Sequence, residues 1–290
     1  MHHSNKQFIG IDIGGTKISG GRILDSQIHE RTQLSVPSTS NKEVVLECLY
    51  EAIDRIFDSK VDGIGVGVPS IVDDQRGIVY DVQNIPSWKE VPIKALLEDR
   101  YNIPVYVNND ANCFVVGEKR FGLGKPFKNL MGITIGTGLG MGLIIHDHLY
   151  SGLHCGAGEL GMIPFHTGIM EEFASAMYFK NKYQKNGIEM HDMAKNGDKQ
   201  ALLAFEELGK NLGKALLVVL YIFAPEAIVL GGSMSKSFEL FKDSMFKELD
   251  HFIFRNQMDS MKIFCSNNPD ISILGASALY LDKNGYAEIS

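Results

Sequence analysis

The stretch FIGIDIGGTKISGGRIL, residues Phe8–Leu24, decides the fold. Its first part, Phe8–Ile13, is short, apolar and rich in β-branched residues, with Asp12 as the only charge, which predicts a buried strand. Gly14-Gly15-Thr16 then turns the chain sharply. We expect Lys17–Leu24 to return beside the first strand as a second one.

This strand–turn–strand unit suits a phosphate group. Glycines carry no side chain, so backbone N–H groups can approach an oxyanion, and Thr16 adds a hydroxyl donor. Asp12, at the end of the first strand, is placed to hold a hydrated Mg²⁺ beside that phosphate. The alternative is an ordinary hairpin whose aspartate caps the turn, because Gly-Gly turns are common. The unit is not a P-loop, since GxxxxGK[ST] is absent.

Length and composition bound the possible functions. The chain has 290 residues, of which 44% are hydrophobic and 22% charged, so it is globular with material for two cores. Its net charge is −7 and no basic cluster stands out, which argues against nucleic acid and anionic membranes as partners. We find neither a transmembrane span nor a signal peptide, and expect a cytoplasmic protein. Four cysteines without a CxxC are expected to be free core thiols: Cys48, Cys113, Cys155 and Cys265.

A second glycine turn repeats the design of the first. Leu130–Ile145 reads LMGITIGTGLGMGLII, in which Gly136-Thr137-Gly138 separates two apolar strands. Two such units, about one domain apart, predict an internally duplicated fold with a ligand between its halves. A third glycine turn, Gly231-Gly232-Ser233, follows the buried strand Ala227–Leu230 and would suit the base and ribose of a nucleotide.

Polar residues also follow a predicted strand at Pro104–Asn108. Asn108-Asn109-Asp110 lies where that strand ends and a helix, Ala111–Phe121, begins. Asp110 could be the N-cap of this helix. A carboxylate at such a junction can equally be the general base for a hydroxyl within hydrogen-bond reach.

Periodicity assigns most of the remaining chain. We expect helices at Asn41–Asp58, Pro92–Tyr101, Glu171–Lys185, Asp198–Ala224, Ser237–Asn256 and Leu274–Asp282, and strands at Gln27–Ser35, Val61–Val68 and Lys262–Ser266. Gly77–Gln83 leads to a loop that holds the only tryptophan, Trp88, as a core anchor. The glycine-rich segment Gly152–Met162 is expected to be irregular.

With these residues in view, the chain resembles a ROK-family sugar kinase (repressor, open reading frame, kinase) of the bacterial glucokinase type. The resemblance covers nearly the whole chain. It rests on DIGGTK at Asp12–Lys17, GVGVP at Gly65–Pro69, NIPSW at Asn84–Trp88, NNDAN at Asn108–Asn112, ITIGTGLGMGLI at Ile133–Ile144, GAGELG at Gly156–Gly161 and PEAIVLGGSMS at Pro225–Ser235.

The resemblance implies a two-lobed α/β fold of the ribonuclease-H-like type, shared by actin, hexokinase and Hsp70, with a central cleft. We expect a small N-terminal lobe of residues 1–112 plus 274–290 and a larger C-terminal lobe of residues 113–273. It also implies a homodimer that binds ATP, Mg²⁺ and a hexose.

The same resemblance implies roles for single residues. Asp110 would be the general base that takes the proton from a sugar hydroxyl. The residues expected to bind sugar hydroxyls are Asn84, Asn109, Asp110, Glu159 and Glu171. Those expected around the phosphates are Gly14, Gly15, Thr16, Lys17, Gly136, Thr137 and Gly138, with Gly231 and Gly232 at the adenosine and Asp12 organising Mg²⁺. Phosphoryl transfer depends on in-line placement and charge neutralisation, which such a set can supply.

One departure from the family pattern concerns zinc. The family usually has ExGH followed by a cysteine-rich loop that holds a structural zinc. Here Met162 stands at the histidine position, and Ile163–Met170 contains no cysteine. His166 alone cannot make a tetrahedral site, so we expect no zinc. The missing histidine also leaves the identity of the hexose open.

We therefore predict an ATP-dependent hexokinase-like enzyme in which Asp110 activates the 6-hydroxyl of a hexose. Glucose is our first expectation; fructose, mannose, allose, an N-acetylhexosamine or a glucoside stay open. The alternatives are a sugar-sensing regulator, which would need a DNA-binding segment ahead of Phe8, and a non-catalytic sugar-binding protein. The presence of Asp12, Asp110 and both Gly-Thr turns disfavours the last of these.

Overall fold

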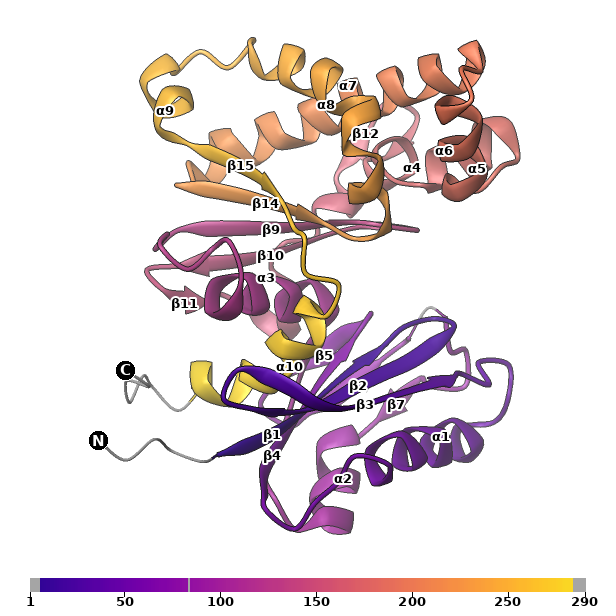
Figure 1. Ribbon diagram of the computed structural model, residues 1–290, viewed down its shortest axis with the longest axis vertical. Helices are drawn as coiled ribbons and strands as arrows, with labels where there is room; N and C mark the ends of the chain where they lie inside the picture. Colours follow the sequence, from indigo (N-terminus) through magenta and orange to yellow (C-terminus); the bar gives the residue numbers. More distant parts are fainter. Residues whose placement is uncertain (1–5, 83, 284–290) are drawn as a thin grey trace. The chain divides into compact units, whose positions relative to one another are not determined.

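The computed structural model describes residues 6–82 and 84–283 (Figure 1). Contacts between residues divide the chain into two compact units. Unit 1 comprises residues 1–126, 142–157 and 268–290, and unit 2 comprises 127–141 and 158–267. Unit 1 thus includes residues 113–126 and 142–157, which the predicted lobes assigned to the C-terminal part. The lobe boundaries stay a prediction, and 1–5, Gln83 and 284–290 lie outside the described residues.

The first sheet is built on the predicted hairpin. Strands β1 (Gln7–Ile13) and β2 (Lys17–Leu24) pair antiparallel, with Ile13 opposite Ile18 beside the glycine turn. The sheet order is β3-β2-β1-β4-β8. Strand β3 (Gln27–Ser35) is antiparallel to β2, whereas β4 (Val61–Val68) and β8 (Val105–Asn109) continue the sheet parallel to β1. The strand–turn–strand prediction is confirmed.

A second five-stranded sheet repeats this order. It runs β11-β10-β9-β14-β15, made of β9 (Leu130–Ile135), β10 (Leu139–Ile145), β11 (His148–Leu149), β14 (Ala227–Gly231) and β15 (Lys262–Cys265). As in the first sheet, a glycine turn joins the central strand to its neighbour, and two parallel strands follow on the other side. The predicted internal duplication is therefore confirmed at the level of strand order.

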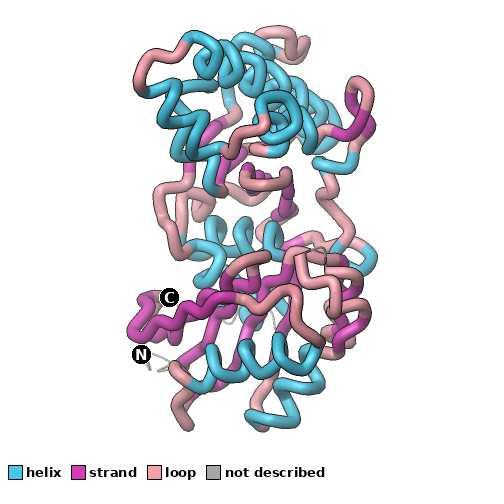
Figure 2. The backbone as a smooth tube through the Cα atoms, turned by 90° about the vertical axis from the view of Figure 1, so that its right-hand side faces the viewer, coloured by secondary structure: helices cyan, strands magenta, loops and turns pink. Residues whose placement is uncertain are grey.

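Helices cover both faces of the first sheet (Figures 1 and 2). Helices α1 (Lys42–Asp54) and α2 (Ile93–Tyr101) lie on one face, and α10 (Ile271–Lys283) lies on the other, beside α3 (Asp110–Phe121). The strand period of two explains this arrangement. Ile9, Ile11 and Ile13 enter the α1-side core, whereas Gly10 faces α10. A Cβ on Gly10 would collide with the carbonyl of Ile273, so glycine lets the α10 backbone touch the sheet.

A smaller sheet of β5 (Ile71–Asp73), β6 (Ile78–Tyr80) and β7 (Glu90–Val91) follows β4 in the sequence. The predicted core anchor is confirmed, because Trp88 is fully buried in the same hydrophobic core as β1 and β4. The Ile85 N–H donates to the Val82 carbonyl at 3.0 Å, which closes the turn that carries Asn84, and the backbone N–H of Trp88 donates to the Ile85 carbonyl at 2.9 Å.

Unit 2 is mostly helical beyond its strands. Its long helix α7 (Lys199–Phe223) packs along α8 (Phe238–Leu249), and Figure 1 shows both above the second sheet. A Cβ on Gly213 of α7 would lie 2.7 Å from the Met245 carbonyl, so glycine sets the close approach of the two helices. The remaining elements are the hairpin β12 (Pro164–Phe165) and β13 (Gly168–Ile169), α4 (Glu171–Ala174), α5 (Met177–Tyr183), α6 (Gly187–Lys195), α9 (Arg255–Ser260) and short 3₁₀ turns at Leu153–Cys155, Leu160–Met162 and Ser233–Ser237.

Several helix predictions were wrong in their extent. The predicted helix Asn41–Asp58 ends at Asp54, and the predicted helix Leu274–Asp282 begins at Ile271. The predicted helix Glu171–Lys185 is two helices, because Ser175 is extended (φ −135°, ψ −176°) between α4 and α5. The predicted helix Ser237–Asn256 ends at Leu249, where Phe252 turns inward and becomes fully buried before α9 begins. In the last two cases, tertiary contacts outweigh helical periodicity.

Two bulk predictions can be compared with the described residues. No helix in residues 6–82 and 84–283 is both long and apolar enough to cross a membrane. All four cysteines are free. Cys113 and Cys155 are buried core thiols, whereas Cys48 and Cys265 are only partly buried, so the core placement holds for two of the four.

Candidate active site

Two of the predicted carboxylates, Asp12 and Asp110, lie near each other in unit 1. Asp12 lies near the end of β1, and Asp110 is the first residue of α3. Burial, reinforced by the charge of Asp110, raises the pKa of Asp12 to about 7, although Lys17 opposes the shift. Burial also raises the pKa of Asp110, while the Ala111 N–H lowers it. The two predicted residues are thus close enough for their charges to interact, and together they favour a proton or a cation between them.

Helix α3 is capped by Asn109 and not by Asp110. The Asn109 side-chain oxygen accepts from the Ala111 N–H at 2.9 Å, and its amide group donates to the Ser70 carbonyl at 3.2 Å. The alternative that Asp110 is merely the N-cap was therefore wrong. Asp110 Oδ1 also accepts from the Ala111 N–H at 2.9 Å, which orients its carboxylate and leaves Oδ2 for another partner. This geometry suits a general base.

A buried pair of amides, which sequence reasoning missed, fixes the same junction. Asn108 Oδ1 accepts from the Asn109 N–H at 2.8 Å and from Asn112 Nδ2 at 2.9 Å. Asn108 and Asn112 are 2% and 0% exposed. Because their groups hold the backbone immediately before Asp110, they set where that carboxylate lies. The only sequence signal was the polar NNDAN motif itself.

The first glycine turn lies against a predicted sugar ligand. The Gly14 N–H donates to the Lys17 carbonyl at 2.8 Å, which closes the turn. A Cβ on Gly15 would lie 2.7 to 2.9 Å from side-chain atoms of Asn84. The structure therefore brings Asn84 to the turn, and Thr16 and Lys17 remain exposed beside it. Backbone N–H groups without a covering side chain can approach an oxyanion here.

In unit 2, the second and third glycine turns adjoin. A Cβ on Gly136 would be 3.8 Å from the Ser233 hydroxyl, and a Cβ on Gly232 would collide with the Ile135 carbonyl. Gly232 also has a positive φ of 82°, so only glycine is tolerated there without strain. The predicted residues Gly136–Gly138 and Gly231–Gly232 thus form one surface at the ends of β9 and β14.

The two predicted sugar-binding glutamates occupy the neighbouring segment of unit 2. Glu171 opens α4, and its Oε2 accepts from the Leu139 N–H at 2.9 Å. Glu159 is exposed at the start of the 3₁₀ turn that contains Gly161. A Cβ on Gly161 would be 3.2 Å from the Glu171 Cβ, so this turn packs against Glu171. Sequence reasoning missed the bond to Leu139, because 32 residues separate its partners.

Comparison with known proteins identifies the family. The ROK family matches residues 8–283. The chain belongs to the ROK family. A glucokinase of Thermotoga maritima is 28% identical over 312 aligned positions, covering 96% of this chain and 98% of the glucokinase. A xylose repressor of Bacillus spizizenii is also 28% identical, covering 94% of this chain and 77% of the repressor.

A solved structure supports the same assignment. The ROK family glucokinase of Streptomyces griseus, in complex with glucose and AMPPNP, matches with a TM-score of 0.80 and 28% identity over 94% of this chain and 98% of that one. The predicted fold class, the α/β fold of the actin and hexokinase superfamily, is confirmed by this likeness and by the duplicated sheet. The family contains both kinases and repressors, so membership alone does not decide between them.

Side-chain packing and hydrogen bonds support residues 162–173, the segment where the family pattern has its zinc-binding loop. Residues 164–169 form the β12–β13 hairpin, and the Ile169 N–H donates to Glu172 Oε2 at 3.0 Å. The rings of Phe165 and Phe173 are 5.7 Å apart, and Met170 is 1% exposed. Met162, in contrast, is 42% exposed. Within the described residues, no group of three or more His, Cys, Asp or Glu side chains is arranged to hold a metal.

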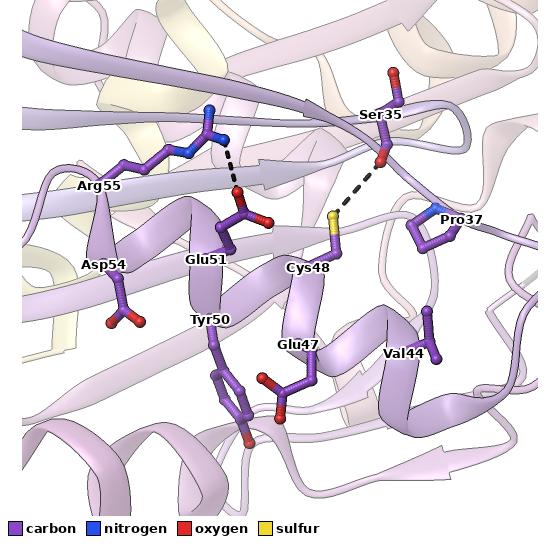
Figure 3. Close-up of a pocket in the computed structure, with 9 residues that line it drawn as sticks. All are labelled: Ser35, Pro37, Val44, Glu47, Cys48, Tyr50, Glu51, Asp54 and Arg55. Carbon is purple, nitrogen blue, oxygen red and sulfur yellow. Dashed lines mark hydrogen bonds and ion pairs between the residues drawn. The ribbon is translucent and has the colours of Figure 1, made fainter.

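Two cavities of unit 1 are lined by none of the predicted site residues. One of about 690 Å³ is a groove between α1 and the end of β3 (Figure 3). Its carboxylate Glu51 is paired with Arg55 at 2.6 Å, and Cys48 Sγ donates to the Ser35 carbonyl. None of the predicted site residues lines this groove. A second cavity of about 270 Å³ includes Asn108 but not Asp110.

Proposed function

We propose that this protein is an ATP-dependent sugar kinase that transfers the γ-phosphoryl group to the 6-hydroxyl of a hexose, with glucose as the first candidate. The observation that carries the proposal is the oriented carboxylate of Asp110, held at the start of α3 near the partly buried Asp12. The similarity to glucokinases of Thermotoga maritima and Streptomyces griseus supports it.

Asp110 is the proposed general base. Its Oδ1 is bound by the Ala111 N–H, so Oδ2 is the atom that would accept the proton of the attacking hydroxyl. Burial raises its pKa, which strengthens it as a base. Asn108 and Asn112 hold the backbone that places it. Placement within reach of the hydroxyl is the larger contribution, because phosphoryl transfer depends mainly on alignment.

Asp12 is the proposed residue for Mg²⁺. The donor set fits, since Mg²⁺ prefers carboxylate oxygens and retains water ligands. A buried carboxylate whose pKa is raised to about 7 by burial and by Asp110 gains most from a nearby cation, which neutralises both charges. When bound, Mg²⁺ would neutralise charge on the phosphates of ATP. Asp12 itself would orient the metal's water through its carboxylate.

The other predicted residues keep their expected roles in this proposal. In unit 1, Asn84 and Asn109 would bind sugar hydroxyls, and Gly14, Gly15, Thr16 and Lys17 would approach the phosphates. In unit 2, Glu159 and Glu171 would bind sugar hydroxyls, and the glycine turns Gly136-Thr137-Gly138 and Gly231-Gly232 would receive the phosphates and adenosine. Carboxylates and amides discriminate between sugars because a wrong epimer leaves them unpaired. We also expect a cytoplasmic homodimer. Light scattering would measure the mass of the particle and so test whether it is a dimer.

A sugar-sensing regulator is the second candidate, because xylose repressors of the family cover 94% of this chain. A non-catalytic sugar-binding protein is a third. A coupled assay of ADP release with Mg·ATP and about a dozen hexoses and derivatives separates them. A kinase releases ADP only with particular sugars. If ADP appears equally fast without sugar and with every sugar tried, or not at all, the proposed activity is refuted.

A further inference from the structure

The second glycine turn is held by a short segment of its own unit, residues 171–176. The Leu139 N–H donates to Glu171 Oε2 at 2.9 Å, and the Ala176 N–H donates to the Gly136 carbonyl at 3.0 Å. Residues on both sides of Thr137 are thus bonded to one segment more than 30 positions away in the sequence. A free glycine turn would sample many conformations, and these bonds restrict it.

Ser175 lies at the centre of this segment. Its side chain is fully buried, and its oxygen lies 2.9 Å from the Thr137 carbonyl and 2.7 Å from the Glu171 carbonyl, so the single hydroxyl proton is shared between these two acceptors. The same oxygen accepts from the Met177 N–H at 3.1 Å. The hydroxyl therefore ties the turn to α4 and begins α5, which explains why the chain breaks its helical path at Ser175.

Glu171 is also confined sterically. A Cβ on Gly138 would overlap the Glu171 carboxylate, and a Cβ on Gly161 would lie 3.2 Å from the Glu171 Cβ. Gly138 and Gly161 thus leave room for this side chain from two sides. Glu171 Oε2 is occupied by the Leu139 N–H, so Oε1 is the atom that can face another ligand.

We propose that Glu171 and Ser175 are positioning residues of the Gly136–Gly138 phosphate turn. In the proposed function, on which this inference rests, Glu171 binds a sugar hydroxyl. The same carboxylate would then hold the turn that receives the nucleotide phosphates, so one side chain serves both substrates. This proposal has a distinctive consequence: removing the Glu171 side chain, which is proposed to bind sugar, weakens nucleotide binding even when no sugar is present.

The test measures binding of Mg²⁺ and a non-hydrolysable ATP analogue by calorimetry, without sugar. Glu171→Ala and Ser175→Ala are each expected to raise the Kd about tenfold, as the loss of one buried hydrogen bond predicts. Glu171→Gln keeps an oxygen for the Leu139 N–H, so its Kd should stay within about twofold of the parent. Ser175→Thr retains the hydroxyl and should recover part of the loss seen with Ser175→Ala.

Two control variants match these changes. Glu172→Ala removes a neighbouring carboxylate that accepts a backbone N–H in the β12–β13 hairpin instead. Ser244→Ala removes a buried hydroxyl that donates to the Phe241 carbonyl within α8. Both should leave the Kd of the analogue unchanged. If Glu171→Ala and Ser175→Ala bind the analogue as tightly as these controls do, the inference is overturned.

Hydrogen exchange of the ligand-free protein separates this inference from the proposed function. Backbone amides of residues 134–141 should exchange faster in Glu171→Ala and Ser175→Ala than in the parent, because the turn loses its anchors. If the parent binds no nucleotide but exchange still rises, the turn is held as inferred and the proposed function fails. If exchange in this segment is unchanged, Glu171 and Ser175 do not position the turn.

Discussion

Replacing Asp12 by asparagine should stabilise the ligand-free protein at alkaline pH while abolishing its activity. Burial and the neighbouring Asp110 raise the pKa of Asp12 from 3.8 to about 7. In the unfolded chain the group loses its proton near pH 3.8, whereas in the folded protein it keeps the proton until about pH 7. The folded state therefore binds more protons between these values, and its stability falls as pH rises from about 4 to 7.

The size of the effect follows from the shift. A difference of about three pKa units corresponds to about 4 kcal/mol at pH 8, since one unit is about 1.4 kcal/mol. Asparagine has nearly the same shape, cannot ionise, and still has to bury a polar amide. We therefore expect Asp12→Asn to gain about 2–4 kcal/mol at pH 8 and little or nothing below pH 4.

Thermal unfolding followed by circular dichroism, without nucleotide or metal, measures this difference. At ~2–4 °C per kcal/mol, the melting temperature at pH 8 should rise by roughly 5–15 °C. The control is Asp25→Asn, which makes the same change at an exposed turn between β2 and β3 and should shift little at either pH. A gain of equal size at pH 4 and pH 8, or a loss at pH 8, would refute the reasoning. Turnover with Mg·ATP should fall at least about 100-fold in Asp12→Asn, as for removal of a transition-state contact.

Three further predictions concern the base, the first turn and zinc. Asp110→Asn keeps the shape of the side chain but cannot accept a proton, so kcat should fall by roughly 10²–10⁴. Equilibrium dialysis should still detect sugar binding. Near-normal turnover in a folded variant would show that Asp110 has no chemical role. Gly15→Val should raise the apparent KM for ATP or abolish turnover. Because the new side chain would collide with Asn84, sugar affinity should fall as well. Unchanged ATP kinetics would show that this turn does not bind phosphate. Metal analysis should find less than about 0.1 zinc per chain, because the ligand set for zinc is missing. Activity should be complete after dialysis against a chelator once Mg²⁺ is restored. Stoichiometric zinc that is lost together with activity would contradict the conclusion that packing around Met170 supports this segment without a metal.

The sequence determined the sheets and the turns between their strands. Phe8–Leu24 and Leu130–Ile145 carry β-branched apolar runs around Gly-Thr turns, and such signals act over a few neighbouring residues. The strands at Gln27–Ser35 and Val61–Val68 are confirmed to the residue for the same reason. Repetition of one local design was also enough to predict an internal duplication, and the two sheets share one strand order.

Only the tertiary structure decided how the site residues meet. Asn109 takes the N-cap because its amide also reaches Ser70, and no local pattern distinguishes it from Asp110. The break at Ser175 depends on the Thr137 carbonyl, 38 positions away, so helical periodicity alone predicted one continuous helix across it.

The raised pKa of Asp12 has the same origin. It depends on the packing that buries it and on a carboxylate nearly one hundred positions later in the chain. Patterns along a chain report the conformation of neighbouring residues, whereas charge, burial and hydrogen bonding depend on groups that only folding brings together.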